Sequence, residues 1–263
     1  MRPATAGGAV ALGLILLGCA TVPYTGRHHL ILISGKEETQ MGLEAYQKTL
    51  KESSLSSAPV QTAMVRRIGE RLARVADQPD FKWEFNLIED DKTVNAFCLP
   101  GGKVAVYTGI LPVTKNETGM AVVMGHEIGH AIAHHGAERM SQQLLVNLGG
   151  TALSAALSSK APETRQVFGE AYGLGTGLGV ILPFSRSHES EADHIGLILM
   201  AQAGYDPREA VEFWKRMEEA SKSPESPMAK YFSTHPGHGQ RIRQIQEWMP
   251  EALDYYRKAV PAK

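Results

Sequence analysis

The middle of the chain contains the stretch Val123-Met124-Gly125-His126-Glu127-Ile128-Gly129-His130, in which two histidines stand four positions apart and a glutamate follows the first. Apolar residues recur at helical spacing around this motif, so we predict a helix over about Asn116 to His135. Residues four apart on a helix project from one face, a turn from each other. Both imidazoles can therefore reach a single metal ion.

The chemistry of this motif points to zinc-dependent hydrolysis. Zinc accepts neutral imidazoles and a carboxylate as ligands, and catalytic zinc sites keep a fourth position for water. Glu127 would lie beside that water, where it can take a proton as general base and pass it to a leaving amine. Gly125, Gly129 and Ala133 form a stripe of small residues beside the histidines. Since each glycine costs a helix about 1 kcal/mol relative to alanine, the stripe predicts that another backbone approaches there.

A third ligand must come from elsewhere, and an acidic segment that begins near Ser185 is the candidate. Glu189 and Asp193 are four apart ahead of an apolar helical run, so they share a face. One of them could bind zinc while the other supports a ligating histidine. Glu191 lies about 200° around the helix from Glu189 and is expected to point away. The alternative is a solvated helix start, where carboxylates favour the helix dipole.

The remaining patterns predict one α+β domain over residues 34–263. A helix from Ser34 to about Leu50, capped by Ser34, precedes a second helix with one apolar face. The residues expected on that face are Val60, Met64, Ile68, Leu72 and Val75.

Three short strands are expected next, within Lys82–Ile88, Ala96–Leu99 and Lys103–Tyr107, the last two joined by a turn at Pro100-Gly101-Gly102. From Lys115 onward every strong pattern is helical. The predicted fold is therefore mainly helical, with a small three-stranded sheet beside the active-site helix.

The amino terminus has the pattern of a bacterial lipoprotein signal. The apolar run from Ala9 to Leu17 is shorter than the roughly 20 residues of a membrane span but suits a signal peptide. Leu16-Leu17-Gly18-Cys19 resembles a lipobox, after which the cysteine is acylated. We predict a signal peptide at 1–18 and a lipidated tether at 19–33. Ala20 after Cys19 favours the outer membrane; the alternative is an ordinary signal peptide with an unrelated cysteine.

Composition excludes some functions. The chain of 263 residues has 27 basic and 28 acidic residues, so no surface for nucleic acid is expected. With Cys19 lipidated, Cys98 has no disulfide partner and is expected to be a buried small residue. Residues 141–183 are rich in Ala, Gly, Ser and Leu, and we expect mobile helices over the active-site cleft there.

Several motifs together resemble one family. They are Pro23-Tyr24-Thr25-Gly26-Arg27, Asn95-Ala96-Phe97-Cys98-Leu99-Pro100-Gly101-Gly102, the His126 motif, Glu189 to Asp193, Thr234-His235-Pro236 and Arg241. Across nearly all of the chain after residue 18, the sequence is similar to the Ste24/Oma1-type zinc metalloproteases. Within them it resembles the soluble bacterial periplasmic branch of BepA/LoiP-like lipoproteins.

The resemblance implies a gluzincin-type zincin fold and assigns roles to single residues. His126, His130 and Glu189 would hold one zinc ion per chain, with Glu127 as base and Asp193 orienting His126. His235 would lie over the metal, where it either steadies the oxyanion or blocks the water position.

Arg241 would position the loop of His235; from the residues alone, spacing cannot choose between His235 and His238. In this fold type the strand with Asn95, Ala96 and Phe97 would pair with an extended substrate. Its alternative is a strand that closes the core.

The function expected from the resemblance is an endopeptidase of the bacterial outer membrane, anchored through Cys19 and facing the periplasm. Its substrates would be misfolded, misassembled or stalled envelope proteins. The alternative is a chaperone-like assembly factor for outer-membrane proteins, with a largely latent zinc site and contacts to the outer-membrane assembly machinery.

Overall fold

The computed structural model describes residues 19–144, 185–222, 228–235 and 238–260. The predicted signal peptide, residues 1–18, lies outside these ranges, as do residues 145–183 of the segment expected to gate the cleft. In the described ranges, none of the helices combines the length and the apolar character that a membrane span requires.

A β-hairpin opens the described chain. β1 (Cys19–Thr21) pairs antiparallel with β2 (His28–Leu30), and the loop between them carries Val22 into the core. The segment predicted as a tether is therefore folded in its first part. Whether Cys19 is lipidated stays a prediction.

Two helices follow the hairpin, as predicted. α2 (Gly35–Glu52) begins with a capping box, in which the Ser34 hydroxyl accepts from the Glu37 N–H and the Glu37 carboxylate accepts from the Ser34 N–H. α3 (Pro59–Val75) buries Val65, Ile68 and Leu72. The predicted apolar face is wrong at Val60, which lies in the first turn of α3 and is 75% exposed, because the buried part of the helix begins only at Val65.

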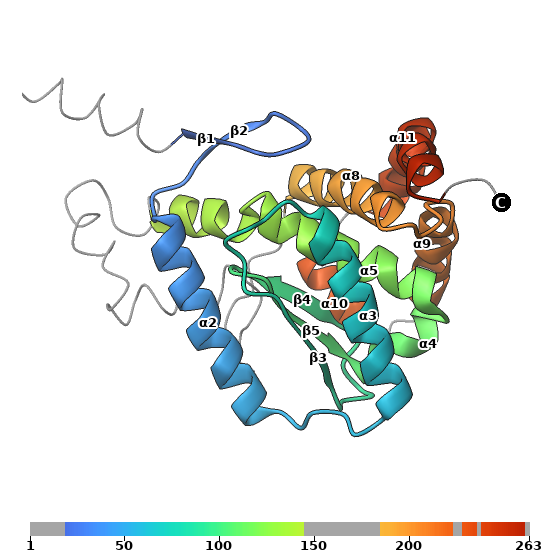
Figure 1. Ribbon diagram of the computed structural model, residues 1–263, viewed down its shortest axis with the longest axis horizontal. Helices are drawn as coiled ribbons and strands as arrows, with labels where there is room; N and C mark the ends of the chain where they lie inside the picture. The colour runs from blue at the N-terminus through green and yellow to red at the C-terminus, as the bar shows by residue number, and fades with distance from the viewer. Residues whose placement is uncertain (1–18, 145–184, 223–227, 236–237, 261–263) are drawn as a thin grey trace, which may run out of the picture.

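The three predicted strands form one sheet (Figure 1). β3 (Glu84–Ile88) runs parallel to β5 (Lys103–Tyr107), and β4 (Ala96–Leu99) runs antiparallel to β5. The order β3-β5-β4 makes β4 an edge strand. This edge lies next to the helix that carries the His126 motif.

That helix is α5 (Glu117–Ile132), capped by the Asn116 side chain, which accepts from the Gly119 N–H. It ends earlier than predicted. Ala133 and His134 form a turn, with His134 in the left-handed region at φ 52°, and helical residues resume at 135. The prediction of a helix that continues to His135 is therefore wrong, and the turn changes the direction of the side chains that follow it.

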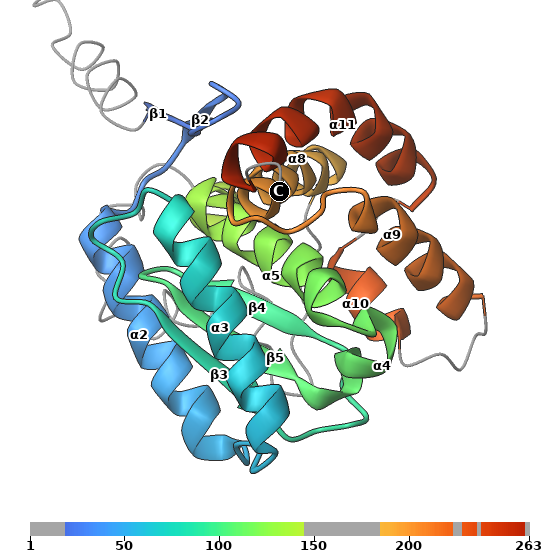
Figure 2. The same cartoon turned by 45° about the vertical axis from the view of Figure 1, so that its right-hand side comes forward.

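From residue 185 onward, the described part of the chain adds the helices α8 (Arg186–Gln202), α9 (Glu209–Ala220), α10 (Met228–Thr234) and α11 (His238–Ala259). α5 packs against α8 on one side and against α3 and β4 on the other (Figures 1 and 2). α11 lies on α8 and α9, away from the sheet. The architecture is the predicted α+β domain with a small sheet.

The small-residue stripe of α5 is the place where α8 approaches. A Cβ added at Gly125 would stand 3.0 Å from the carbonyl oxygen of Gly196, and one added at Gly129 would stand 2.8 Å from that of Ala192. Backbone therefore meets backbone along this contact. The close approach brings the first turns of α8 next to the histidines of α5.

This contact predicts that Gly129→Ala destabilises the fold by about 1–3 kcal/mol, the usual cost of overpacking, although alanine is the better helix former. Urea unfolding of the purified chain measures the change. Gly35→Ala is the matched control, because a Cβ at that helical glycine meets nothing within 4 Å. Equal unfolding free energies for the two variants would contradict the explanation.

Candidate metal centre

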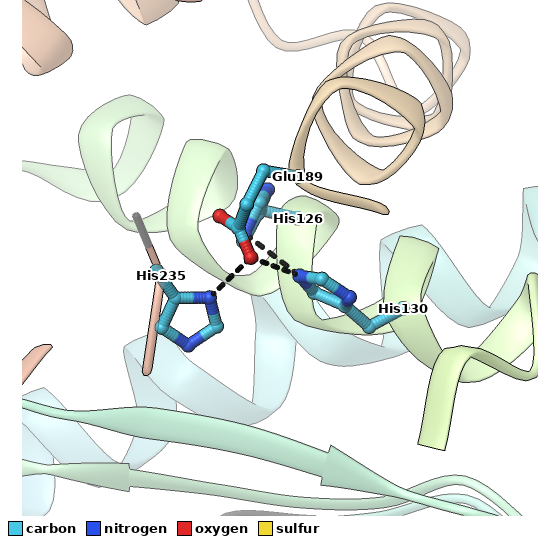
Figure 3. Close-up of side chains that lie close together, drawn as sticks. All are labelled: His126, His130, Glu189 and His235. Atoms are coloured by element: carbon cyan, nitrogen blue, oxygen red, sulfur yellow. Dashed lines mark hydrogen bonds and ion pairs between the residues drawn. The ribbon is translucent and has the colours of Figure 1, made fainter. Parts of the chain in front are cut away.

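Four buried side chains, from two helices and from the residue that follows a third, converge at one point: His126, His130, Glu189 and His235 (Figure 3). Each offers a ligand atom, and these atoms all lie within 4.8 Å of one another. The two histidines come from one face of α5, and Glu189 comes from the first turn of α8. His235 directly follows α10. Sequence spacing alone could not choose between His235 and His238. The structure places His235 in the group.

The distances within the group suit a small metal ion. His126 Nε2 lies 3.1 Å from His130 Nε2, and each of these nitrogens lies 3.4 Å from an oxygen of Glu189. Ligand atoms about 2.0–2.1 Å from a tetrahedral zinc ion stand about 3.3–3.4 Å apart. Two imidazoles and a carboxylate at this spacing fit zinc.

Neighbouring residues fix the position of Glu189 and keep its carboxyl group ionised. Ser185 caps α8 by accepting from the His188 N–H, so the carboxylate lies in the first turn. Burial raises the pKa of Glu189, but His235 and Arg241 hold it well below its usual range. The residue is therefore a carboxylate at neutral pH, as a metal ligand must be.

Asp193 lies one turn further along α8 and contacts the other nitrogen of His126. Asp193 Oδ1 is 2.9 Å from His126 Nδ1, so a proton on Nδ1 leaves Nε2 free to bind a metal. Arg241 donates two hydrogen bonds of 2.6 Å to the Asp193 carboxylate. Arg241 and His126 outweigh burial and lower the pKa of Asp193. This geometry matches the orienting role expected of Asp193.

Arg241 is completely enclosed. Its guanidinium carbon lies 3.5 Å from the centre of the Trp214 ring, and Nη1 lies 3.0 Å from Glu189 Oε2. Its contacts thus join two carboxylates of α8, Glu189 and Asp193. The positioning of the His235 loop that we expect of Arg241 stays a prediction.

Glu127 faces the cleft beside the metal group. It is buried, its Oε1 atom has no hydrogen-bond partner among the residues that the structure describes, and His235 Nε2 lies 3.8 Å away. Burial raises the pKa of Glu127 above the usual value for glutamate. A carboxylate with a raised pKa can accept a proton and release it again near neutral pH.

The edge strand forms the opposite wall of this cleft. A pocket is lined by Glu127, His130, Thr234 and His235 on one side and by Asn95 to Cys98 on the other. Because Tyr107 N–H donates to the Asn95 carbonyl and strands alternate, the backbone groups of Ala96 and Cys98 point away from β5, on the outer side of the edge strand. Cys98 is buried, as predicted, and burial raises the pKa of its thiol.

Two residues near the site have contacts that the sequence did not reveal. His135 is fully buried, and its Nδ1 lies 2.8 Å from His130 Nδ1. Glu191 points away from the metal group, as predicted, but its carboxylate accepts from His135 Nε2 at 2.8 Å. The sequence pattern gives no sign of this pair, because it predicts continuous helix through Ala133 and His134.

Comparison with known sequences adds the family. A sequence model of peptidase family M48 matches residues 59–249, which include the metal group and Arg241. The chain belongs to peptidase family M48.

Individual M48 relatives come from mitochondria and from bacteria. "Mitochondrial metalloendopeptidase OMA1" of Schizosaccharomyces pombe is 39% identical over 234 residues, which are 88% of this chain and 66% of the relative. "Metalloendopeptidase OMA1, mitochondrial" of Homo sapiens is 30% identical over 243 residues, 88% and 46% of the two chains. "Beta-barrel assembly-enhancing protease" of Escherichia coli is 29% identical over 220 residues, 82% and 44% of the two chains.

These matches confirm the predicted resemblance at the level of the M48 family. The mitochondrial relative from S. pombe is more similar to this chain than the bacterial one, so the bacterial branch stays a prediction. The matched part spans less than two thirds of the length of each of these three relatives.

Proposed function

We propose that this protein is a zinc-dependent endopeptidase of the bacterial cell envelope, which cleaves misfolded or stalled envelope proteins. The observation that carries the proposal is the joint position of His126, His130 and Glu189 beside the buried Glu127 carboxylate. Membership in the M48 family supports hydrolysis of peptide bonds.

The side chains of the site divide the work of hydrolysis. Zinc bound by His126, His130 and Glu189 would polarise the scissile carbonyl and increase the acidity of a water molecule. Glu127 takes the proton from water onto its unpartnered Oε1 and delivers it to the departing amine. His235 has Nδ1 3.1 Å from Glu189 Oε1 and Nε2 3.8 Å from Glu127 Oε1; with a proton on Nε2, it would donate to the oxygen of the attacked carbonyl.

The edge strand β4 supplies the binding surface for an extended peptide. Outward backbone groups of Ala96 and Cys98 would pair with substrate main chain, which gives affinity with little dependence on sequence. This mode of binding suits unfolded segments, because only an extended chain can add to the edge of a sheet.

The envelope location rests on the lipobox before Cys19 and on the bacterial relatives. The E. coli relative is described as a beta-barrel assembly-enhancing protease, which supports substrates or partners among outer-membrane assembly proteins for this chain as well. In this proposal the lipid on Cys19 anchors the domain to the outer membrane, on its periplasmic side.

A second candidate function is a chaperone-like assembly factor with a latent metal site. His235 favours it, because its ring offers a fourth ligand atom within the same group and would then occupy the water position. Binding of client proteins would in that case be independent of Glu127.

Glu127→Gln tests the choice between the two. We expect casein hydrolysis by the purified chain to fall by about 10²–10⁴-fold, because the general base is lost, while bound zinc stays stoichiometric by metal analysis. Glu212→Gln, an exposed position on α9, is the control and should retain full hydrolysis. Hydrolysis that resists a chelator, or a wild-type chain without affinity for zinc, would overturn the proposal; activity in cells that survives Glu127→Gln would favour the second candidate.

Ala96→Pro tests the edge strand. Proline removes an N–H that points away from β5 and leaves the hydrogen bonds with β5 intact. Loss of one main-chain hydrogen bond of about 0.5–1.5 kcal/mol should raise KM for an unstructured peptide about 2–10-fold, with an unchanged melting temperature. Ala96→Gly keeps the N–H and is the control. A folded Ala96→Pro variant with the KM of the wild type would exclude β4 as the substrate strand.

Cys19→Ala tests the anchor. In cells that express the full chain, we expect this variant to move from the outer-membrane fraction to the soluble fraction, because the acylated residue is gone. Cys98→Ala replaces the other cysteine of the chain and should remain with the membrane. Identical fractionation of the two variants would exclude a lipid anchor at Cys19.

A further inference from the structure

A second group of charged side chains lies beside the metal group, between α5, α8 and the N-terminal hairpin; all of them are buried except the half-buried arginine of the hairpin. Its members are Arg27, His135, Glu138, His188 and Glu191, which we call the hairpin cluster. The His135 ring stacks on His188 with centres 4.4 Å apart, and His188 Nε2 lies 3.3 Å from Glu138. The metal chemistry described above uses none of these residues.

The hairpin cluster reaches a metal ligand through one hydrogen-bonded path. His130 directs Nε2 at the metal group, so its Nδ1 carries the proton and donates to His135 Nδ1 at 2.8 Å. His135 then has its proton on Nε2, which donates to Glu191 Oε2 at 2.8 Å. Each step has one donor and one acceptor, so the position of every proton follows from the metal-binding role of His130 Nε2.

Arg27 extends this path to the N-terminal hairpin. Its Nε atom donates to Glu191 Oε2 at 2.7 Å, and its two terminal nitrogens donate to the Glu138 carboxylate at 3.1 and 2.7 Å. The Thr25 hydroxyl donates to the other oxygen of Glu191. Arg27 and Thr25 belong to the loop between β1 and β2. The hairpin is thus joined to α8 and to the helical residues after α5 by charge-assisted bonds.

The two ligating histidines are therefore supported in parallel ways. His126 donates to Asp193 directly, and Asp193 is held by Arg241. His130 donates to Glu191 through His135, and Glu191 is held by Arg27. In both cases a carboxylate on α8 fixes the tautomer and the orientation of a ring on α5, and an arginine from a distant segment fixes the carboxylate.

We propose that Arg27, Glu191 and His135 are positioning residues for His130, so that docking of the N-terminal hairpin sets the affinity of the site for zinc. The proposal rests on the proposed function, since it assumes that His130 binds zinc. Release of the hairpin would leave the buried Glu191 carboxylate without its partner, the Arg27 guanidinium. The His135 and His130 rings would then lose their fixed orientation.

Zinc affinity of the full-length chain, measured by competition with a chromophoric chelator, tests this proposal. We expect zinc affinity to fall about 10–100-fold in Glu191→Gln, the usual effect of losing such a partner of a ligating histidine, and by a smaller factor in Arg27→Gln. Arg27→Lys keeps the charge and should recover part of the loss. The absorption spectrum of the cobalt-substituted protein should shift in Glu191→Gln, because the geometry at His130 changes.

Arg67→Gln is the matched control. It removes an arginine that pairs with Glu117, at the opposite end of the helix that carries the histidines. Zinc affinity should stay at the wild-type value in this variant. Melting temperatures measured without metal show whether each variant is folded. We expect Arg27→Gln to be folded even if Glu191→Gln is not.

The possible results separate the two proposals. Wild-type zinc affinity in folded Arg27→Gln, or an equal loss in Arg67→Gln, would overturn the positioning role while leaving the proposed function intact. A wild-type chain that binds no zinc would overturn the proposed function instead.

Discussion

The backbone contact between α5 and α8 is the constraint on which the rest of the structure depends. Gly125 and Gly129 on one helix meet Gly196 and Ala192 on the other at distances that exclude larger side chains. Because the helices lie this close, the short side chains Glu189 and Asp193 reach imidazoles on the neighbouring helix. Glycine lowers the stability of a helix, but here it allows the close contact that places the metal-binding side chains together.

Buried charge is the second organising feature. Glu127, Glu189 and Asp193 lie beside Arg241 in a place with almost no access to water. Three carboxylates and one guanidinium leave an excess of two negative charges, which a divalent cation would neutralise. Isolated buried charges are costly, so this balance explains why acidic side chains gather here. Arg241 is held both by the carboxylates and by the face of Trp214.

The sequence predicted those parts of the site that depend on spacing within one helix. His126 with His130, and Glu189 with Asp193, are pairs four residues apart, so helical geometry alone places them correctly. His235 and Arg241 reach the site through tertiary packing, and only the family resemblance indicated them. The pairing of His135 with His130 was missed because it depends on the left-handed backbone at His134, for which no turn residue such as glycine or proline gave a signal. The exposure of Val60 was also missed, since helical periodicity does not show at which turn a helix begins to contact the core.

The N-terminal hairpin would limit the distance between the domain and a membrane to which Cys19 is anchored. β1 begins at Cys19 itself, so a lipid carried by this residue would be followed by folded structure with no slack chain between them. Arg27 then fixes the hairpin to the body of the domain. An enzyme attached in this way would have a short reach and a preferred tilt above the bilayer. The choice of substrates would then depend on which unfolded segments come close to the membrane surface, as well as on the chemistry of the cleft.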